Sequence, residues 1–437
     1  MAKRNGYKAF VAGKAHDRDA TGFVADTAAY DLFPHQHDLV RWACRRGRAA
    51  IFADTGLGKT RMQVAWADLV AKREGVRVLI LAPLAVADQT AREAHDALGV
   101  TVKHCRDGAE VSDGITITNY DRLHRFDARM FGAVVLDESS CIKHHDAKTL
   151  KTLIEAFGPT PYKLCATATP APNDWTELGT HAEFLGVRTR AEMLSEFFTH
   201  DGGETQTWRL KGHGRAPFWK WVATWGAMIR SPTDLGHDGS AYNLPPMSVH
   251  QHIVHAEVAA PEGALFAPEA ATMMERKQAR KASVLARVDA VARMVNASER
   301  PWLVWCELNA EGDALEGAIT GAIQVAGADD NETKEARIRD FLDGRARVMV
   351  SKSSIMGFGL NFQHCADIAF VGVTDSYESY YQAVRRCWRF GQKRPVNVHV
   401  FSSQQEGAVV ANLKRKESDA SAMFDSMMAE TRAAMRE

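Results

Sequence analysis

Short apolar runs alternate with segments of helical spacing along most of the chain from about Leu32 onward. Apolar runs rich in β-branched residues are typical of parallel strands that are covered by helices on both faces. In the first half the predicted strands are Ala49–Ala53, Val76–Ala82, Ile115–Thr118, Ala133–Leu136 and Lys163–Thr167. The segments Arg61–Lys72 and Asp88–Leu98 carry apolar residues at helical spacing. This pattern predicts an α/β domain built on a parallel sheet.

The alternation stops at residues 186–260, which hold four of the ten tryptophans and no clear buried strand. Trp221 and Trp225 are four residues apart, which favours a helical core over a surface for stacking on nucleic-acid bases. We therefore predict a mostly helical insertion. A basic helix-like segment, Glu275–Val295, leads into a second α/β series. Its predicted strands are Trp302–Cys306, Ala346–Ser351, Ile368–Val373 and Val396–Phe401.

These patterns predict the organisation of the whole chain. The expected parts are an N-terminal arm (1–30), a first lobe (31–185), a mostly helical insertion (186–265), a second lobe (266–405) and a helical tail (406–437). A length of 437 residues suits two or three domains. The two lobes are each long enough to bury a core without disulfides or structural metals.

Charge and cysteine usage narrow the class of protein. Lys+Arg and Asp+Glu number 54 each, so any binding of nucleic acid must come from local basic stripes. The seven cysteines show no CxxC spacing, which argues against a zinc ribbon or a disulfide framework and suits a reducing cytosol. The longest apolar stretch, around Val78–Ala87, is too short for a bilayer, and no signal peptide is indicated. We expect a cytoplasmic protein with no membrane partner.

The run Ala53–Thr60 (ADTGLGKT) lies between a predicted strand and a predicted helix. Glycines let backbone N–H groups converge on phosphate oxygens, and a helix N-terminus adds a favourable dipole. Lys59 is placed for the β- and γ-phosphates, and the Thr60 hydroxyl for a bound Mg²⁺. Ala53 stands where the usual pattern has glycine. The predicted nucleotide-binding residues of this loop are Thr55, Gly56, Leu57, Gly58, Lys59 and Thr60.

Two further strand ends carry residues that suit phosphate chemistry. Asp137 and Glu138 follow the strand Ala133–Leu136, and two adjacent carboxylates there are costly without a nearby cation. With ATP and Mg²⁺ bound, Asp137 would hold the metal, and Glu138 would orient and deprotonate the attacking water. The run Ala166–Pro170 (ATATP) places small hydroxyl residues after the next strand, where they would sense the phosphate site.

The second half contains the complementary basic residues. Ile355–Asn361 (IMGFGLN) follows a strand, and its Gly357 and Gly359 permit close backbone approach. In Gln382–Gln392 (QAVRRCWRFGQ), Arg386 and Arg389 are three residues apart and would share one helix face. Paired arginines that face a triphosphate neutralise the charge of the transition state.

The order of these motifs from Leu32 to about Phe401 resembles the helicase ATPases of superfamily two. Within it, the chain is most similar to the Swi/Snf-like branch of DNA translocases, especially compact versions carried by bacteriophages and prophages. The motifs that carry the likeness are DTGLGKT, APLAV, ITNYDRL, DESS, ATATP, GFGLN and QAVRRCWRFGQ. The ending RFGQ is the most specific, because relatives of this branch typically show R-x-x-R-I-G-Q.

The resemblance implies two RecA-like parallel-sheet lobes with ATP bound in a cleft between them. It implies that Arg389 is the arginine finger, that Arg386 accompanies it on the phosphates and that Gln382 lies beside them. Gln36 resembles the glutamine that reads adenine, since an amide pairs both edges of that base. Ser140 departs from the family, because relatives carry His or Asp there to link nucleotide state to nucleic-acid motion.

The expected activity is that of a monomeric ATP-driven motor on duplex or branched DNA, with contacts to phosphates and no sequence preference. Two alternatives remain open. The first is an RNA-dependent helicase of the same superfamily, against which the RFGQ ending argues. The second is a catalytically inactive nucleotide-binding assembly protein. The intact set that argues against it is Lys59, Asp137, Glu138, Arg386 and Arg389.

Overall fold

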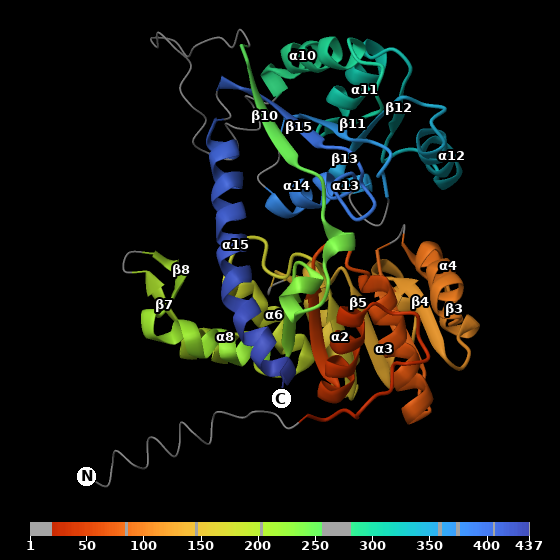
Figure 1. Cartoon of the computed structure of the whole chain (residues 1–437), viewed down its shortest axis with the longest axis vertical. Coiled ribbons are helices and arrows are strands. Elements are labelled where there is room, and N and C mark those ends of the chain that lie inside the picture. Colours follow the sequence, from red (N-terminus) through yellow and green to blue (C-terminus); the bar gives the residue numbers. More distant parts are fainter. Residues whose placement is uncertain are drawn as a thin grey trace. The chain divides into compact units, whose positions relative to one another are not determined.

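The computed structural model describes residues 20–83, 86–144, 147–201, 204–255, 281–356, 361–372, 376–404 and 407–436. The chain forms two compact units. The first unit comprises residues up to Gly239 together with Ala422–Glu437, and the second comprises Ser240–Ser421. Each unit is an α/β structure around its own parallel sheet (Figure 1), as the apolar runs predict. Among the described helices, none is both long and apolar enough to cross a bilayer.

The first unit has a seven-stranded parallel sheet in the order β3-β4-β2-β5-β6-β1-β9. Its strands are β1 (Arg48–Ala53), β2 (Val78–Ala82), β3 (Val102–His104), β4 (Ile115–Asn119), β5 (Ala133–Asp137), β6 (Tyr162–Ala166) and β9 (Gly226–Ile229). The central strands β2, β4 and β5 are buried at every position. Parallel strands carry their C-terminal ends to one edge, so the segments that follow β1, β5 and β6 lie together.

Helices cover both faces of this sheet. Helix α3 (Lys59–Glu74) packs on β2, β5 and β6 with α2 (Pro34–Arg46) and α4 (Ala87–Leu98) beside it. Alternate strand residues such as Phe52 and Leu136 form the core of the other face. The helices that pack there are α5 (Lys148–Phe157), α6 (Leu178–Leu185), α7 (Arg190–Phe197), α8 (Arg215–Ala223) and the end of α15 (Gly407–Arg436). The predicted C-terminal helix is therefore present.

The described part of the predicted insertion 186–265 is not mostly helical, so this prediction is wrong there. Besides α7 and α8 it contains an antiparallel hairpin of β7 (Phe198–Asp201) and β8 (Glu204–Leu210), the edge strand β9 and β10 (Met247–Val254). Strand β9 is fully buried and pairs with β1, although its four residues form too short a run to be recognised in the sequence. Trp225 is 1% exposed and lies in the core, whereas Trp221, four residues before it, is partly buried against that core. Trp219, at 2% exposed, is also a core residue.

The second unit has a six-stranded parallel sheet in the order β10-β15-β14-β11-β13-β12. The strands after β10 are β11 (Trp302–Cys306), β12 (Ala322–Val325), β13 (Val348–Lys352), β14 (Asp367–Val371) and β15 (Val396–Ser403). Helices α10 (Val284–Asn296) and α11 (Asn309–Ala318) pack on one face of the sheet. Core residues from α12 (Asn331–Leu342) and α14 (Tyr377–Val384), with α13 (Ser353–Met356) close by, lie on the other face. The two units thus have the architecture of two RecA-like lobes.

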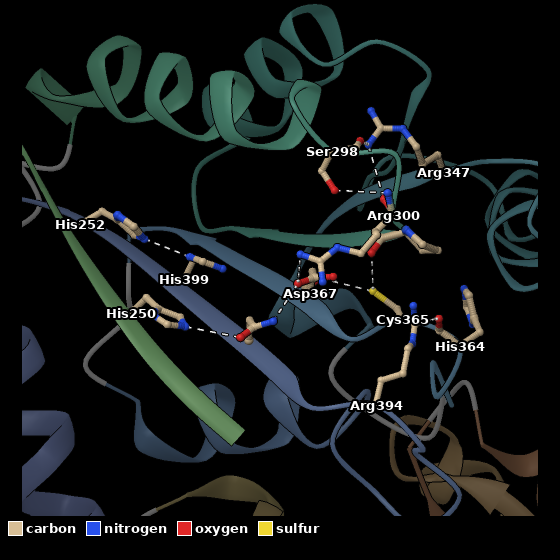
Figure 2. A network of polar contacts seen from close by, with 12 residues as sticks. His250, His252, Ser298, Arg300, Arg347, His364, Cys365, Asp367, Arg394 and His399 are labelled. Carbon is tan, nitrogen blue, oxygen red and sulfur yellow. Dashed lines mark hydrogen bonds and ion pairs between the residues drawn. The ribbon is translucent and has the colours of Figure 1, made fainter. Parts of the chain in front are cut away.

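A polar network fastens the N-terminal ends of the second sheet (Figure 2). Asp367, the first residue of β14, is fully buried and lies 3.1 Å from the Arg300 guanidinium. Its Oδ1 also accepts a hydrogen bond from the Asn397 amide at 3.1 Å. Arg347 donates to the Ser298 carbonyl oxygen at 2.6 Å. Removing one partner of a buried charge is strongly destabilising. These contacts therefore stabilise the N-terminal ends of the strands in the second sheet.

Histidines line the pairing of the edge strand β10 with β15. The Nε2 of His252 lies 3.0 Å from the Nδ1 of His399, and the His250 ring stacks on the His399 ring (Figure 2). Burial, with His250, His252 and Arg300 adding to it, lowers the pKa of His399 to about 4. A hydrogen bond between two imidazoles needs one neutral acceptor, so protonation of both rings would break this bond and weaken the pairing of the two strands.

Acid is therefore expected to weaken the β10–β15 pairing. The unfolded chain, with a His pKa of about 6.5, takes up the proton before the folded one, so the stabilisation is complete above pH 6.5 and disappears toward pH 4. We predict a loss of about 1 kcal/mol between pH 7 and pH 5, reduced for the partial exposure of the ring. Hydrogen exchange of the β10 and β15 amides measures it. His399→Phe should flatten this dependence, whereas His213→Phe, an exposed control, should leave it unchanged.

Candidate active site

The phosphate loop runs from the end of β1 into α3, as predicted. Gly56 and Gly58 have φ values of 93° and 78°, which residues with a Cβ rarely adopt. The Lys59 ammonium donates a hydrogen bond to the Ala53 carbonyl oxygen at 3.0 Å, so the side chain folds back over the loop. Asp54 accepts a hydrogen bond from the Thr55 amide at 2.6 Å. Thr60 lies in the first turn of α3 and is partly exposed.

Gln36 of α2 holds the backbone of this loop. Its side chain is 1% exposed, and its amide nitrogen donates to the Leu57 carbonyl oxygen at 2.9 Å. Its amide oxygen accepts from the Phe33 N–H at 3.0 Å. A Cβ on Gly58 would lie 2.2 Å from the Gln36 amide nitrogen. Gln36 therefore contacts the loop residues directly, and its predicted contact with adenine remains a prediction.

Asp137 ends β5 with a carboxylate that is 9% exposed. Gln63, one turn along α3 from Lys59, donates a hydrogen bond to its Oδ1 at 2.7 Å. Burial, together with the charge of Glu138, raises the pKa of Asp137 to about 6, although Gln63 and Lys59 act in the opposite direction. A nearby divalent cation would stabilise the ionised form of such a carboxylate. The phosphate loop and the first of the two carboxylates thus lie at one edge of the sheet.

Glu138 has a strained backbone. Its φ of 49° and ψ of 52° make it the one non-glycine residue with positive φ in the described part of the chain. The left-handed conformation costs about 1–2 kcal/mol for a residue with a Cβ. The fully buried Thr167 of the ATATP run donates to the Glu138 carboxylate at 3.4 Å, and the Thr169 amide donates to Thr167 at 3.1 Å. The ATATP run therefore contacts the second carboxylate.

A buried histidine supports the next residue. The hydroxyl of Ser139 lies 3.1 Å from the Nε2 of His181, and both side chains are fully buried. Burial lowers the pKa of His181 to about 4, so the ring is neutral at physiological pH. His181 lies on α6 and fixes the turn that follows Glu138.

The arginine motif of the second unit adopts a different local structure from the one predicted. Helix α14 ends at Val384, and Arg386 and Arg389 lie in the turns that follow, so they do not share a helix face. The side chains of Gln382 and Arg386 are each 5% exposed. Gly357 and Gly359 lie outside the described residues.

Gln392, the last residue of RFGQ, organises these turns. Its amide nitrogen donates to the carbonyl oxygens of Cys365 at 2.9 Å and Cys387 at 3.1 Å. Its amide oxygen accepts hydrogen bonds from the N–H groups of Lys393 and Arg394. The side chain is 6% exposed. Gln392 therefore has a structural role that the motif alone does not reveal.

Two residues of the site, Gln63 and His181, were not predicted. Tyr120 was predicted only as part of the ITNYDRL motif and as a candidate contact to nucleic acid, without its bond to Asp137. Gln63 follows Lys59 by four residues, so helical spacing alone places both on one face of α3. The Tyr120 hydroxyl donates to the Asp137 carbonyl oxygen at 2.7 Å. Tyr120 follows the predicted strand Ile115–Thr118 by two residues and lies within the ITNYDRL motif, which are the sequence signals for it. No sequence signal identifies His181, because its partner lies on a different element.

Comparison with known families agrees with the motifs. Residues 35–201 match the SNF2-related domain family, and residues 286–391 match the helicase conserved C-terminal domain family. The first match contains the phosphate loop and both carboxylates, and the second contains Arg386 and Arg389. A comparison with curated proteins found no match. The chain belongs to the Snf2-like helicases of superfamily two. This pair of domains supports a nucleic-acid-dependent ATPase.

The contact between Gly58 and Gln36 gives a testable prediction. Gly58→Ala should lose about 1 kcal/mol of stability to left-handed strain and also displace Gln36 from the loop, weakening ATP binding about tenfold. Gly75→Ala is a matched control, because Gly75 ends the same helix at φ 65° with open space around it. Gly75→Ala should lose a similar amount of stability and keep its affinity for ATP. Thermal unfolding and titration with a fluorescent ATP analogue separate the two effects, and equal ATP affinity in both variants would contradict the prediction.

Proposed function

We propose that the protein is an ATP-driven DNA translocase that hydrolyses ATP with residues from both units and moves along duplex or branched DNA. The observation that carries the proposal is the convergence of Lys59, Asp137, Glu138 and Thr167 at one edge of the first sheet. A second unit whose Arg386 and Arg389 fall within a helicase C-terminal domain supports it. We infer a monomeric motor that acts in the cytoplasm, including that of a bacteriophage host.

The residues of the first unit have distinct proposed roles. The loop from Thr55 to Gly58 would bind phosphate oxygens through its backbone N–H groups, and Lys59 would leave the Ala53 carbonyl for the β- and γ-phosphates. Thr60 and Asp137 would hold Mg²⁺ that arrives with ATP, the ion supplying charge neutralisation of the phosphates. Glu138 would accept a proton from the attacking water, with Thr167 fixing its carboxylate.

The residues of the second unit would complete the site when the units close on ATP. Arg389 would neutralise charge on the γ-phosphate as an arginine finger, and Arg386 would accompany it. Gln382 is a candidate to lie beside them, and its Nε2 makes no hydrogen bond within the described residues. Gly357 and Gly359 would permit close backbone approach. Gln36 would read adenine while holding Leu57.

DNA is proposed over RNA because the RFGQ ending resembles the motif of the DNA-translocating Swi/Snf-like branch. Contacts to phosphates would position the polymer without reading its sequence. An RNA-dependent helicase and an inactive nucleotide-binding assembly protein are the alternatives that the following experiment separates.

ATP hydrolysis should be slow alone and strongly stimulated by duplex or forked DNA. The assay compares no polymer, single-stranded DNA, duplex DNA, forked DNA and RNA at one fixed salt concentration, because phosphate contacts weaken steeply with ionic strength. Glu138→Gln should bind ATP but hydrolyse it about 10²–10⁴-fold more slowly. Lys59→Ala should lose ATP binding. Stimulation by RNA alone would support the RNA helicase, and tight ATP binding with no turnover on any polymer would support the assembly protein.

The contribution of the second unit is tested separately. Arg389→Ala should keep ATP binding to the first unit but lower the stimulated rate about 10³-fold, since an arginine finger acts on the transition state. Arg385→Ala is the matched control in the same turn, because the Arg385 guanidinium lies over the Trp388 ring, 4.4 Å from its centroid. It should hydrolyse ATP at close to the wild-type rate. Equal rates for the two variants would place Arg389 outside the active site.

A further inference from the structure

A single side chain connects two strand ends of the first sheet that are not neighbours. Tyr120 is the first residue of the turn η2 (Tyr120–Arg125), which follows β4. Its phenol O–H donates a hydrogen bond to the carbonyl oxygen of Asp137 at 2.7 Å. Strand β2 lies between β4 and β5 in the sheet, so the tyrosine reaches across the end of β2. The bond therefore joins the loop after β4 to the strand end that carries both carboxylates.

The acceptor of this bond is the peptide group that links Asp137 to Glu138. That peptide leads directly into the left-handed conformation of Glu138. A strained backbone persists only where its surroundings hold it. The Tyr120 hydroxyl is thus one of the contacts that fix the orientation of the Glu138 carboxylate.

The turn η2 also presents positive charge to solvent. Arg122 and Arg125 are three residues apart in a 3₁₀ turn, in which side chains at this spacing lie above one another. Arg125 is exposed and Arg122 is half-buried. Within the described residues neither forms an ion pair with an acidic side chain. Two arginines on one face, without carboxylate partners, suit the phosphates of a nucleic-acid backbone.

The end of β4 contains an unsatisfied amide as well. Asn119 is 2% exposed, and neither its nitrogen nor its oxygen has a hydrogen-bond partner in the described part of the chain. Buried polar groups without partners are rare, and they mark places where strain is stored or another group binds. A rearrangement of this strand end would allow Asn119 to form the missing bonds. The junction of β4 and η2 therefore contains an amide group whose hydrogen-bonding capacity is unused.

The residue that normally links nucleotide state to nucleic acid in this family is replaced. Ser140 occupies the position of the usual His or Asp, is 2% exposed and forms no side-chain hydrogen bond within the described ranges. The direct side-chain connection from the β4 loop to the carboxylates runs through Tyr120 instead.

We propose that Tyr120 is a positioning residue that transmits nucleic-acid binding at η2 to the peptide between Asp137 and Glu138. The inference rests on the nucleic-acid-stimulated ATPase proposed above. A polymer held by Arg122 and Arg125 shifts η2, and the Tyr120 hydroxyl passes this shift to the backbone that orients Glu138. Binding and coupling then reside in different residues of one turn, so they can be separated by substitution.

The experiment measures stimulated ATP hydrolysis against duplex DNA concentration at fixed salt. Tyr120→Phe should reduce the ratio of stimulated to unstimulated rate about fivefold, which corresponds to about 1 kcal/mol of coupling. The DNA concentration for half-maximal stimulation should stay close to that of wild type. The double variant Arg122→Gln/Arg125→Gln should instead raise this concentration while keeping the ratio of stimulated to unstimulated rate at saturating DNA. The slope of log K for DNA binding against the logarithm of salt concentration should become less steep by about two.

Two control variants match these changes. Tyr162→Phe removes a phenol at the opposite end of the sheet, where its partner is Glu74, and should leave the ratio unchanged. Arg129→Gln removes an exposed arginine that is already paired with Asp127 and should leave DNA affinity unchanged. Thermal unfolding of every variant separates a loss of coupling from a loss of folding.

The outcomes distinguish this inference from the proposed function. If no polymer stimulates ATP hydrolysis by the wild-type chain, both the proposed function and this inference are wrong. If DNA stimulates the wild type and the Tyr120→Phe variant equally, the inference alone is overturned. The same holds if the double variant needs the same DNA concentration as the wild type for half-maximal stimulation. Hydrogen exchange of residues 133–142 in the wild type gives a measurement that does not depend on any variant. DNA should alter exchange at the Asp137–Glu138 turn, and no change there would overturn the inference.

Discussion

Two adjacent carboxylates at the end of a fully buried strand impose the main constraint on the first unit. Asp137 and Glu138 repel each other, and the pKa of Asp137 rises as a result of burial and of this repulsion. Contacts from three other elements hold the pair: Gln63 of α3 on Asp137, Tyr120 of η2 on the connecting peptide, and Thr167 after β6 on Glu138. A site arranged in this way is favourable chiefly when a cation and a phosphate group are present.

In each parallel sheet the N-terminal and C-terminal ends of the strands have different roles. The N-terminal ends carry contacts that fasten the fold, such as Asp367 with Arg300 in the second unit. In the first unit the buried Lys163 of β6 donates to the Phe184 carbonyl oxygen at 2.9 Å. The C-terminal ends of β1, β5 and β6 carry the phosphate loop, the carboxylates and the ATATP run. Strained and unpaired groups such as Glu138 and Asn119 are tolerated at that edge because the opposite edge is fixed.

Hydrophobic periodicity was enough to predict most buried strands of both units and the helices α3, α4, α10 and α15, because continuous apolar runs and helical spacing are local signals. Helices α2 and α12 were not predicted. Strand β9 was missed because its four residues, Gly226–Ile229, make too short a run, and β10 because it exposes Val249 and Ile253. Glycine spacing identified the phosphate loop. Gln63 and Tyr120 could not be assigned, because what they do depends on Asp137, which is distant in sequence and near only in the folded chain.

The residues of the arginine motif have structural roles as well as chemical ones. A continuous helix would carry Arg386 and Arg389 on one face, but the chain leaves the helix at Val384. Gln392 then binds the carbonyl oxygens of Cys365 and Cys387, and Gly391, at φ 90°, permits the turn. The glycine and glutamine of RFGQ therefore shape the backbone that carries both arginines. Their positions follow from this backbone, so a substitution at Gln392 would displace the guanidinium groups without removing either charge.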